Sequence, residues 1–212
     1  MTSALDALAR LKAGNLRFST DAQERGASIS SAERSELAKG QEPFAVVLGC
    51  ADSRVAPELL FDQDLGGLFT VRVAGHVVAA PVLESVELAV EQFGAKLVVV
   101  LGHTDCAAVH ATLAEVQTPG TPAAEKLSAV IHHIKPPVEA VLSLSPKRPF
   151  TEAEQGALMH ASVRANIRHS ACQLREDSTV ISALVESGEV LVVGAEYSLE
   201  TGAVEFIDGL PD

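Results

Sequence analysis

The chain has 212 residues, 47% of them hydrophobic and 21% charged, which suits one α/β-sized domain with a substantial core and is short for two independent ones. A formal net charge of −12 at pH 7 and the lack of a basic run argue against a nucleic-acid partner and against attraction to an anionic membrane. No apolar stretch approaches the roughly 20 residues that span a bilayer, and Asp6, Arg10 and Lys12 interrupt the region where a signal peptide would be apolar.

Helices and strands are predicted to alternate along the chain. An amphipathic helix over 3–13, with Gly14 as its stop, and a second helix over 31–39 form an N-terminal helical arm, residues 1–40. Short, β-branched apolar runs predict strands at 44–49, 68–73, 96–102 and 189–197, with a hairpin partner at 204–208. Further helices are predicted at 81–93, 105–116, 152–175 and 178–187. Six of the ten prolines fall within 119–149, which predicts short helical pieces linked by turns there.

This alternation indicates an α/β fold: a mainly parallel β-sheet flanked by helices, with residues 41–212 as a single domain. In such sheets, ligands bind at the carboxyl ends of the strands.

Three cysteines are too few for a secreted disulfide framework, so we expect a cytoplasmic protein in which cysteines act as ligands or nucleophiles.

Two predicted strands end in the same way, with VVLGCADSR (46–54) and VVLGHTDCA (99–107). If these strands are neighbours, Cys50 and His103 lie about 5 to 10 Å apart at one edge of the sheet. Cys106, three residues after His103, adds a second thiol. Zinc binds imidazole and thiolate readily, and three protein ligands leave a fourth position for water or substrate, as in catalytic zinc sites.

Asp52 and Arg54 are two residues apart, so on an extended segment their side chains point the same way and can pair. Asp52 also lies close enough to the expected metal to become a fourth ligand. It therefore has two possible partners: when Arg54 holds it the site is open, and when the metal holds it the site is closed.

Three segments, in this order and spacing, closely resemble the bacterial β-class carbonic anhydrases: CADSR (50–54), VRVAG (71–75) and GHTDCAAV (102–109). Weaker similarities are the pairs Gly14-Asn15 and Arg17-Phe18 and the segment GAEYSLETG (194–202). Two departures concern single residues. His76 stands where an Asn is common, and Val47 stands where one subclass has a Trp that, with counterparts of Arg72 and Tyr197, binds a second, non-catalytic bicarbonate.

The resemblance implies one Zn²⁺ per chain on Cys50, His103 and Cys106, and the reversible hydration of CO₂ to bicarbonate and a proton by zinc-bound hydroxide. It implies that Asp52 orients that hydroxide and that Arg54 holds Asp52 off the metal. It also implies self-association to a dimer, often to a tetramer, in which the arm packs on a neighbouring subunit and an apolar CO₂ pocket forms at the interface.

Other interpretations stay open at this point. The scaffold could carry a non-catalytic zinc module or bicarbonate sensor, or an enzyme for another heterocumulene such as CS₂. A phosphatase-like thiolate is disfavoured because CADSR leaves no room for a glycine-rich anion loop. We expect His76 to be a packing residue or a residue that supports the ligands without binding the metal. We expect Cys172 to be buried and idle, and Asp105 to cap the helix that follows it.

Overall fold

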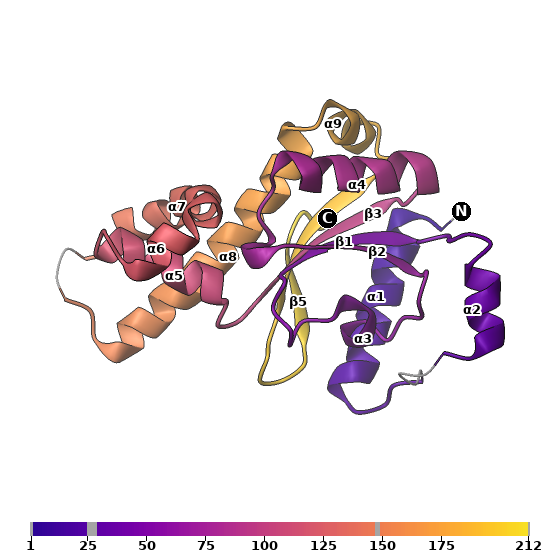
Figure 1. Ribbon diagram of the computed structural model, residues 1–212, viewed down its shortest axis with the longest axis horizontal. Coiled ribbons are helices and arrows are strands. Elements are labelled where there is room, and N and C mark those ends of the chain that lie inside the picture. Colours follow the sequence, from indigo (N-terminus) through magenta and orange to yellow (C-terminus); the bar gives the residue numbers. More distant parts are fainter. Residues whose placement is uncertain (1, 25–28, 147–148, 212) are drawn as a thin grey trace.

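The computed structural model describes residues 2–24, 29–146 and 149–211, and a single five-stranded sheet runs through them (Figure 1). The strand order is β2-β1-β3-β4-β5. The first four strands are parallel and β5 is antiparallel to β4, which confirms the predicted mainly parallel sheet. The strands are β1 (Ala45–Gly49), β2 (Leu68–Arg72), β3 (Leu97–His103), β4 (Leu191–Tyr197) and β5 (Val204–Asp208).

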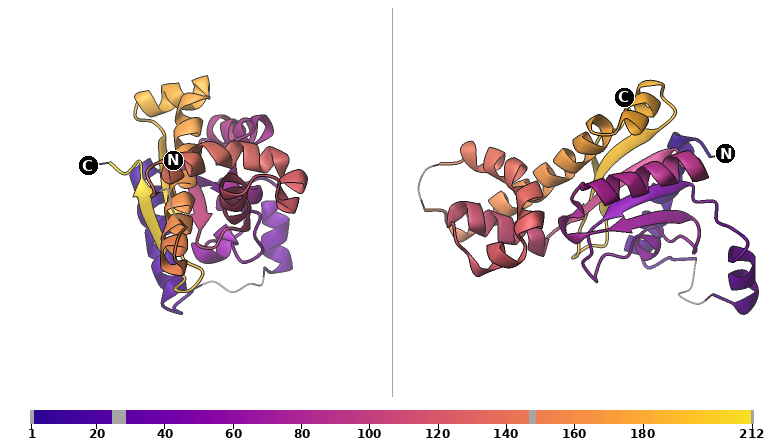
Figure 2. Two further views of the ribbon diagram at one scale, coloured as in Figure 1. Left: turned by 90° about the vertical axis from the view of Figure 1, so that its left-hand side faces the viewer. Right: turned by 45° about the horizontal axis from the view of Figure 1, so that its top comes forward.

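Helices cover both faces of this sheet. One face carries α4 (Ala80–Phe93), α8 (Glu152–Glu176) and α9 (Thr179–Glu186); the other carries α1 (Ala4–Ser19) and α3 (Pro57–Leu60). A lobe of α5 (Ala107–Gln117), α6 (Pro122–Lys126) and α7 (Ser128–Ser143) stands beyond one end of the sheet, against the first half of α8 (Figure 2). The helix α2 (Ser31–Leu37) lies at the periphery and buries none of its residues. In the described parts of the chain, no helix has both the length and the apolarity that crossing a membrane requires.

The central strands β1 and β3 have every residue buried. Alternate side chains enter different cores: Val46 and Val98 pack toward α4 and α8, whereas Val47 and Val99 pack toward α1. Burial on both faces explains why these strands read as continuous apolar runs rather than alternating ones.

The first helix does not stop at Gly14, as the sequence predicted, but continues to Ser19. A Cβ atom at Gly14 would lie 1.8 Å from the backbone oxygen of Phe61. The missing side chain therefore allows α1 to approach the end of α3 closely, and that contact, rather than helix termination, requires glycine here.

Asn15 joins three parts of the same chain through its buried side chain. Its Nδ2 donates to the carbonyl oxygens of Leu60 (3.1 Å) and Gly202 (2.9 Å), and its Oδ1 accepts from the amide of Val204 (2.7 Å).

We expect Asn15→Ala to lower the free energy of unfolding by about 3 kcal/mol, because buried polar groups would lose their partners. Urea denaturation measures this. Ser19→Ala, which removes an exposed hydrogen bond within the same helix, should change it by less than about 0.5 kcal/mol, and equal effects of the two variants would contradict the assignment.

The prediction of a broken 119–149 region was wrong for its second half. The helix α7 runs for 16 residues and contains both Pro136 and Pro137. Two prolines remove backbone donors and disfavour a helix locally. The buried residues Ile131, Ile134 and Val138 place one face of α7 in the core, and packing of such a face outweighs local propensity.

Candidate metal centre

The two similar strand ends meet at the same edge of the sheet. β1 and β3 pair directly in parallel, with Gly49 beside Leu101, so Cys50 and His103 leave adjacent strands. Cys106 follows at the N-terminal end of α5. One ligand atom from each of these three residues lies within 4.8 Å of the others, and the two Sγ atoms are 4.0 Å apart. All three side chains are buried, so solvent water competes little with them for a bound metal ion.

The imidazole of His103 is held in the tautomer that a metal needs. Its Nδ1 lies 2.8 Å from the carbonyl oxygen of Thr104 and must donate, because that oxygen can only accept. The lone pair is therefore on Nε2, which is buried and has no hydrogen-bond partner among the described residues. A buried acceptor beside two sulfur atoms is explained if an ion completes the group. Two thiols and one imidazole are a donor set that suits zinc.

The two thiols share one negative charge. The hydrogen bond from Cys106, and after it the interaction with His103, lowers the pKa of Cys50 well below its usual range, against the opposing effect of burial. The Cys50 thiolate and burial in turn raise the pKa of Cys106. Burial lowers the pKa of His103, but the neighbouring Cys50 thiolate outweighs it and the net shift is upward. The field of the thiolate thus favours a positive charge at the centre of the three side chains.

Asp52 and Arg54 form a two-pronged ion pair beside this centre. The Nε and Nη2 atoms of Arg54 donate to Oδ1 (3.0 Å) and Oδ2 (2.7 Å) of Asp52, and the Arg54 amide also donates to Oδ1 (2.9 Å). The residues lie in a turn, not on the extended segment that the sequence suggested. The Arg54 hydrogen bond holds the pKa of Asp52 well below its usual range, so the carboxylate is ionised at neutral pH. Its Oδ2 lies 3.9 Å from Nε2 of His103.

Arg72 holds the loop that carries Cys50 and Asp52. Its Nε donates to the carbonyl oxygen of Cys50 (3.0 Å) and its Nη2 to that of Asp52 (2.6 Å). In the sequence, Arg72 stands out within VRVAG and as part of a possible second bicarbonate site. Its role in holding the loop was missed, because no local pattern shows which carbonyl a distant arginine reaches. The two other positions of that site are buried: Val47 lies within β1, and Tyr197 packs against Phe18.

Two of the expectations about neighbouring residues were wrong. Asp105 does not cap α5: the N-cap position belongs to Cys106, and Asp105 is an exposed residue with φ of 55° in the preceding turn. Cys172 is half-buried rather than buried, because its position on α8 lies at the edge of the core. His76 is fully buried, as expected of a packing residue, and burial lowers its pKa to about 4.

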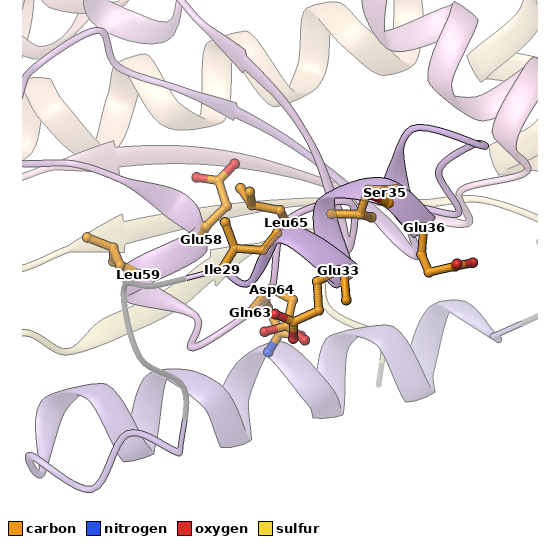
Figure 3. A pocket seen from close by; sticks show the side chains of 11 residues that line it. Ile29, Glu33, Ser35, Glu36, Glu58, Leu59, Gln63, Asp64 and Leu65 are labelled. Carbon is orange, nitrogen blue, oxygen red and sulfur yellow. The ribbon is translucent and has the colours of Figure 1, made fainter.

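A cavity of about 650 Å³ lies elsewhere, between α2 and the segment around α3 (Figure 3). Leu59 and Leu65 contribute apolar side chains to its lining, and Glu33, Glu36, Glu58 and Asp64 contribute acidic ones. The cavity shares no residue with the cluster of Cys50, His103 and Cys106.

Comparison with known proteins gives a consistent result. A family model described as "Carbonic anhydrase" matches residues 45–204. The chain is 38% identical over 202 residues to the "Carbonic anhydrase" of Mycolicibacterium smegmatis, covering 95% of this chain and 92% of that protein. The structure of the β-carbonic anhydrase CcaA superposes with a TM-score of 0.71 at 21% identity, covering 98% of this chain and 91% of that one. One of two tetrameric β-carbonic anhydrases from Sordaria macrospora gives 0.67 at 19% identity, covering 82% and 85%.

Proposed function

Because the chain belongs to the carbonic anhydrase family and has the β-class fold, we propose that it catalyses the reversible hydration of CO₂ to bicarbonate and a proton, using one Zn²⁺ per chain held by Cys50, His103 and Cys106. The observation that carries this proposal is the buried Nε2 of His103, which has no hydrogen-bond partner in the described part of the chain, on a residue clustered with two thiols. The protein is proposed to act in the cytoplasm, where reducing conditions keep such thiols available as ligands.

A zinc ion bound at these side chains would act as a Lewis acid and acidify a water molecule at its open fourth position. Asp52 would accept a hydrogen bond from the attacking water and so orient the lone pair of the water oxygen toward CO₂. Arg54 keeps the carboxylate ionised and fixes its direction through two parallel hydrogen bonds. Release of Asp52 from Arg54 would free it to become a fourth ligand and close the site.

Two alternatives are less well supported. A non-catalytic zinc module or bicarbonate sensor would not require a carboxylate that an arginine holds beside the metal ligands. An enzyme for another heterocumulene, such as CS₂, would use the same centre, but the relatives that cover nearly the whole chain are carbonic anhydrases.

The test is stopped-flow CO₂ hydration over pH values from about 6.5 to 9, on protein whose zinc content has been determined. We expect one zinc per chain and turnover across the range. Turnover confined to the alkaline end would show that Asp52 closes the site when hydroxide is scarce. Protein with full zinc and no turnover at any pH would contradict the proposed activity and favour the non-catalytic alternative.

We also propose that the chain associates with itself, to a dimer or a tetramer, and that its N-terminal arm contacts a neighbouring subunit. The apolar face of α1 already packs on its own sheet, so the contact is assigned to α2 and the cavity beside it. Leu59 and Leu65 are 57% and 56% exposed there, as expected of a surface that a partner covers (Figure 3).

Sedimentation velocity at micromolar concentration should show an oligomer that Leu59→Glu shifts toward the monomer, because a buried interface does not tolerate an unpaired charge. Leu144→Glu is the matched control, since Leu144 is 90% exposed on the opposite lobe and should leave the oligomer intact. A monomeric wild-type protein, or equal effects of the two substitutions, would show that this surface is not the interface.

A further inference from the structure

A strained turn connects β2 to α4 directly beside the metal centre. This turn, η1 (Ala74–His76), contains two consecutive residues in the left-handed region: Gly75, with φ of 64°, and His76, with φ of 44°. A residue with a Cβ atom rarely adopts that conformation, and it persists where the surrounding structure holds it. The turn directs the amide of Gly75 at the Sγ atom of Cys50, at 3.4 Å.

One buried side chain from α8 bonds to both Gly75 and His76. Asn166 is 1% exposed, and its Nδ2 lies 3.0 Å from the carbonyl oxygen of Gly75 and 3.0 Å from Nε2 of His76. The Asn166 amide donates to both. The buried His76 ring is neutral at physiological pH, and the Asn166 Nδ2 can only donate, so the lone pair of the ring lies on Nε2.

Apolar contacts confine the same turn but do not orient its amide. A Cβ atom at Gly75 would lie 2.5 Å from Cδ1 of Ile134 on α7 and 3.1 Å from Cβ of Ala108 on α5. Such contacts limit where the turn lies, whereas hydrogen bonds also fix its rotation. Asn166 thus supplies a directional restraint on the peptide units around Gly75.

We propose that Asn166 is a positioning residue for the metal centre: by holding Gly75 and His76 it keeps the Gly75 amide directed at the sulfur of Cys50. That hydrogen bond stabilises the thiolate and withdraws electron density from it, so that a bound metal ion keeps more of its positive charge. This matters because two thiolates otherwise cancel the charge of a divalent ion. The inference rests on the zinc site proposed above.

The experiment compares Asn166→Leu, which keeps a similar size without donors, with Ser162→Ala. Ser162 lies one turn earlier on the same helix, is fully buried, and its hydroxyl has no hydrogen-bond partner among the described residues. Zinc affinity is measured by competition with a chelator in the full-length protein. The absorption spectrum of the Co²⁺-substituted protein reports the thiolate-to-metal charge-transfer band.

We expect Asn166→Leu to weaken zinc binding by about 10-fold or more, because Cys50 loses the support that orients it as a ligand. The charge-transfer band should move to longer wavelength, because the sulfur becomes more electron-rich. Ser162→Ala should change neither. An unchanged zinc affinity and band in folded Asn166→Leu, or the same changes in Ser162→Ala, would overturn the inference while leaving the zinc site intact. A wild-type protein that binds no zinc would instead overturn the proposed function itself.

A measurement on the wild-type protein covers the case in which Asn166→Leu fails to fold. In protein loaded with ¹¹³Cd and labelled with ¹⁵N-glycine, the Gly75 amide proton should show scalar coupling to the metal through the Cys50 sulfur. Absence of that coupling, with the metal bound, would overturn the inference.

Discussion

Replacing Asp52 with alanine should leave one zinc per chain in place and lower kcat/KM for CO₂ hydration by about 100-fold or more. In the proposed mechanism the three ligand side chains do not depend on Asp52, whereas the orientation of the attacking water does. The carboxylate is ionised and fixed by three hydrogen bonds from Arg54, so its position is set before substrate arrives. Stopped-flow hydration and metal analysis on the same preparation measure both quantities.

Asp105→Asn is the matched control for this variant. Asp105 is exposed, lies in the turn between two of the ligands, and its charge also acts on Arg54. Removing that charge should leave turnover within a few-fold of wild type. Unchanged turnover in Asp52→Ala would remove Asp52 from the mechanism, and loss of zinc from that variant would identify it as a ligand instead.

Replacing Cys106 with serine should abolish stable zinc binding and, with it, turnover. A hydroxyl would replace one of the two sulfur donors in a buried group of three, and zinc in proteins takes thiolate and imidazole rather than a serine hydroxyl. Metal content after dialysis against a chelator, followed by stopped-flow hydration, measures the effect.

Cys172→Ser makes the same chemical change away from the centre. Cys172 is half-buried on α8 and does not belong to the cluster of possible ligands. This variant should keep full zinc and wild-type turnover. A Cys106→Ser protein that keeps both would show that the ligand set is wrong, and loss of zinc in Cys172→Ser would show that the metal lies elsewhere.

Much of the candidate site was predictable because its parts are local in sequence. Cys50, Asp52 and Arg54 lie within five residues at the end of one apolar run, and His103 and Cys106 lie within four at the end of another. Apolar runs of this length indicate buried parallel strands, and parallel strands end at the same edge of a sheet. Two local patterns therefore placed both groups of residues at one edge of the sheet. Their meeting depended on the two strands being neighbours, which β1 and β3 are.

The side chains that support this site were decided by the tertiary structure. Arg72 reaches back 20 and 22 residues to the carbonyl oxygens of Asp52 and Cys50, and Asn166 reaches back 90 or more to Gly75 and His76. Neither contact leaves a local pattern, because a buried polar residue on a helix looks the same in sequence whichever backbone group it bonds.

The same reason explains the errors in the helices. The sequence by itself determined the alternation of strands and helices, the parallel sheet and the five residues of the candidate centre, since each depends on short-range periodicity and spacing. Gly14 reads locally as a stop, yet the close approach of Phe61 decides its role. Pro136 and Pro137 predict an interruption of the helix when only their neighbours in sequence are considered. The burial of Ile134 and Val138 nevertheless keeps α7 intact. In both cases contacts between segments distant in sequence outweigh conformational preferences of about 1 to 3 kcal/mol per residue, and only the folded chain brings those contacts together.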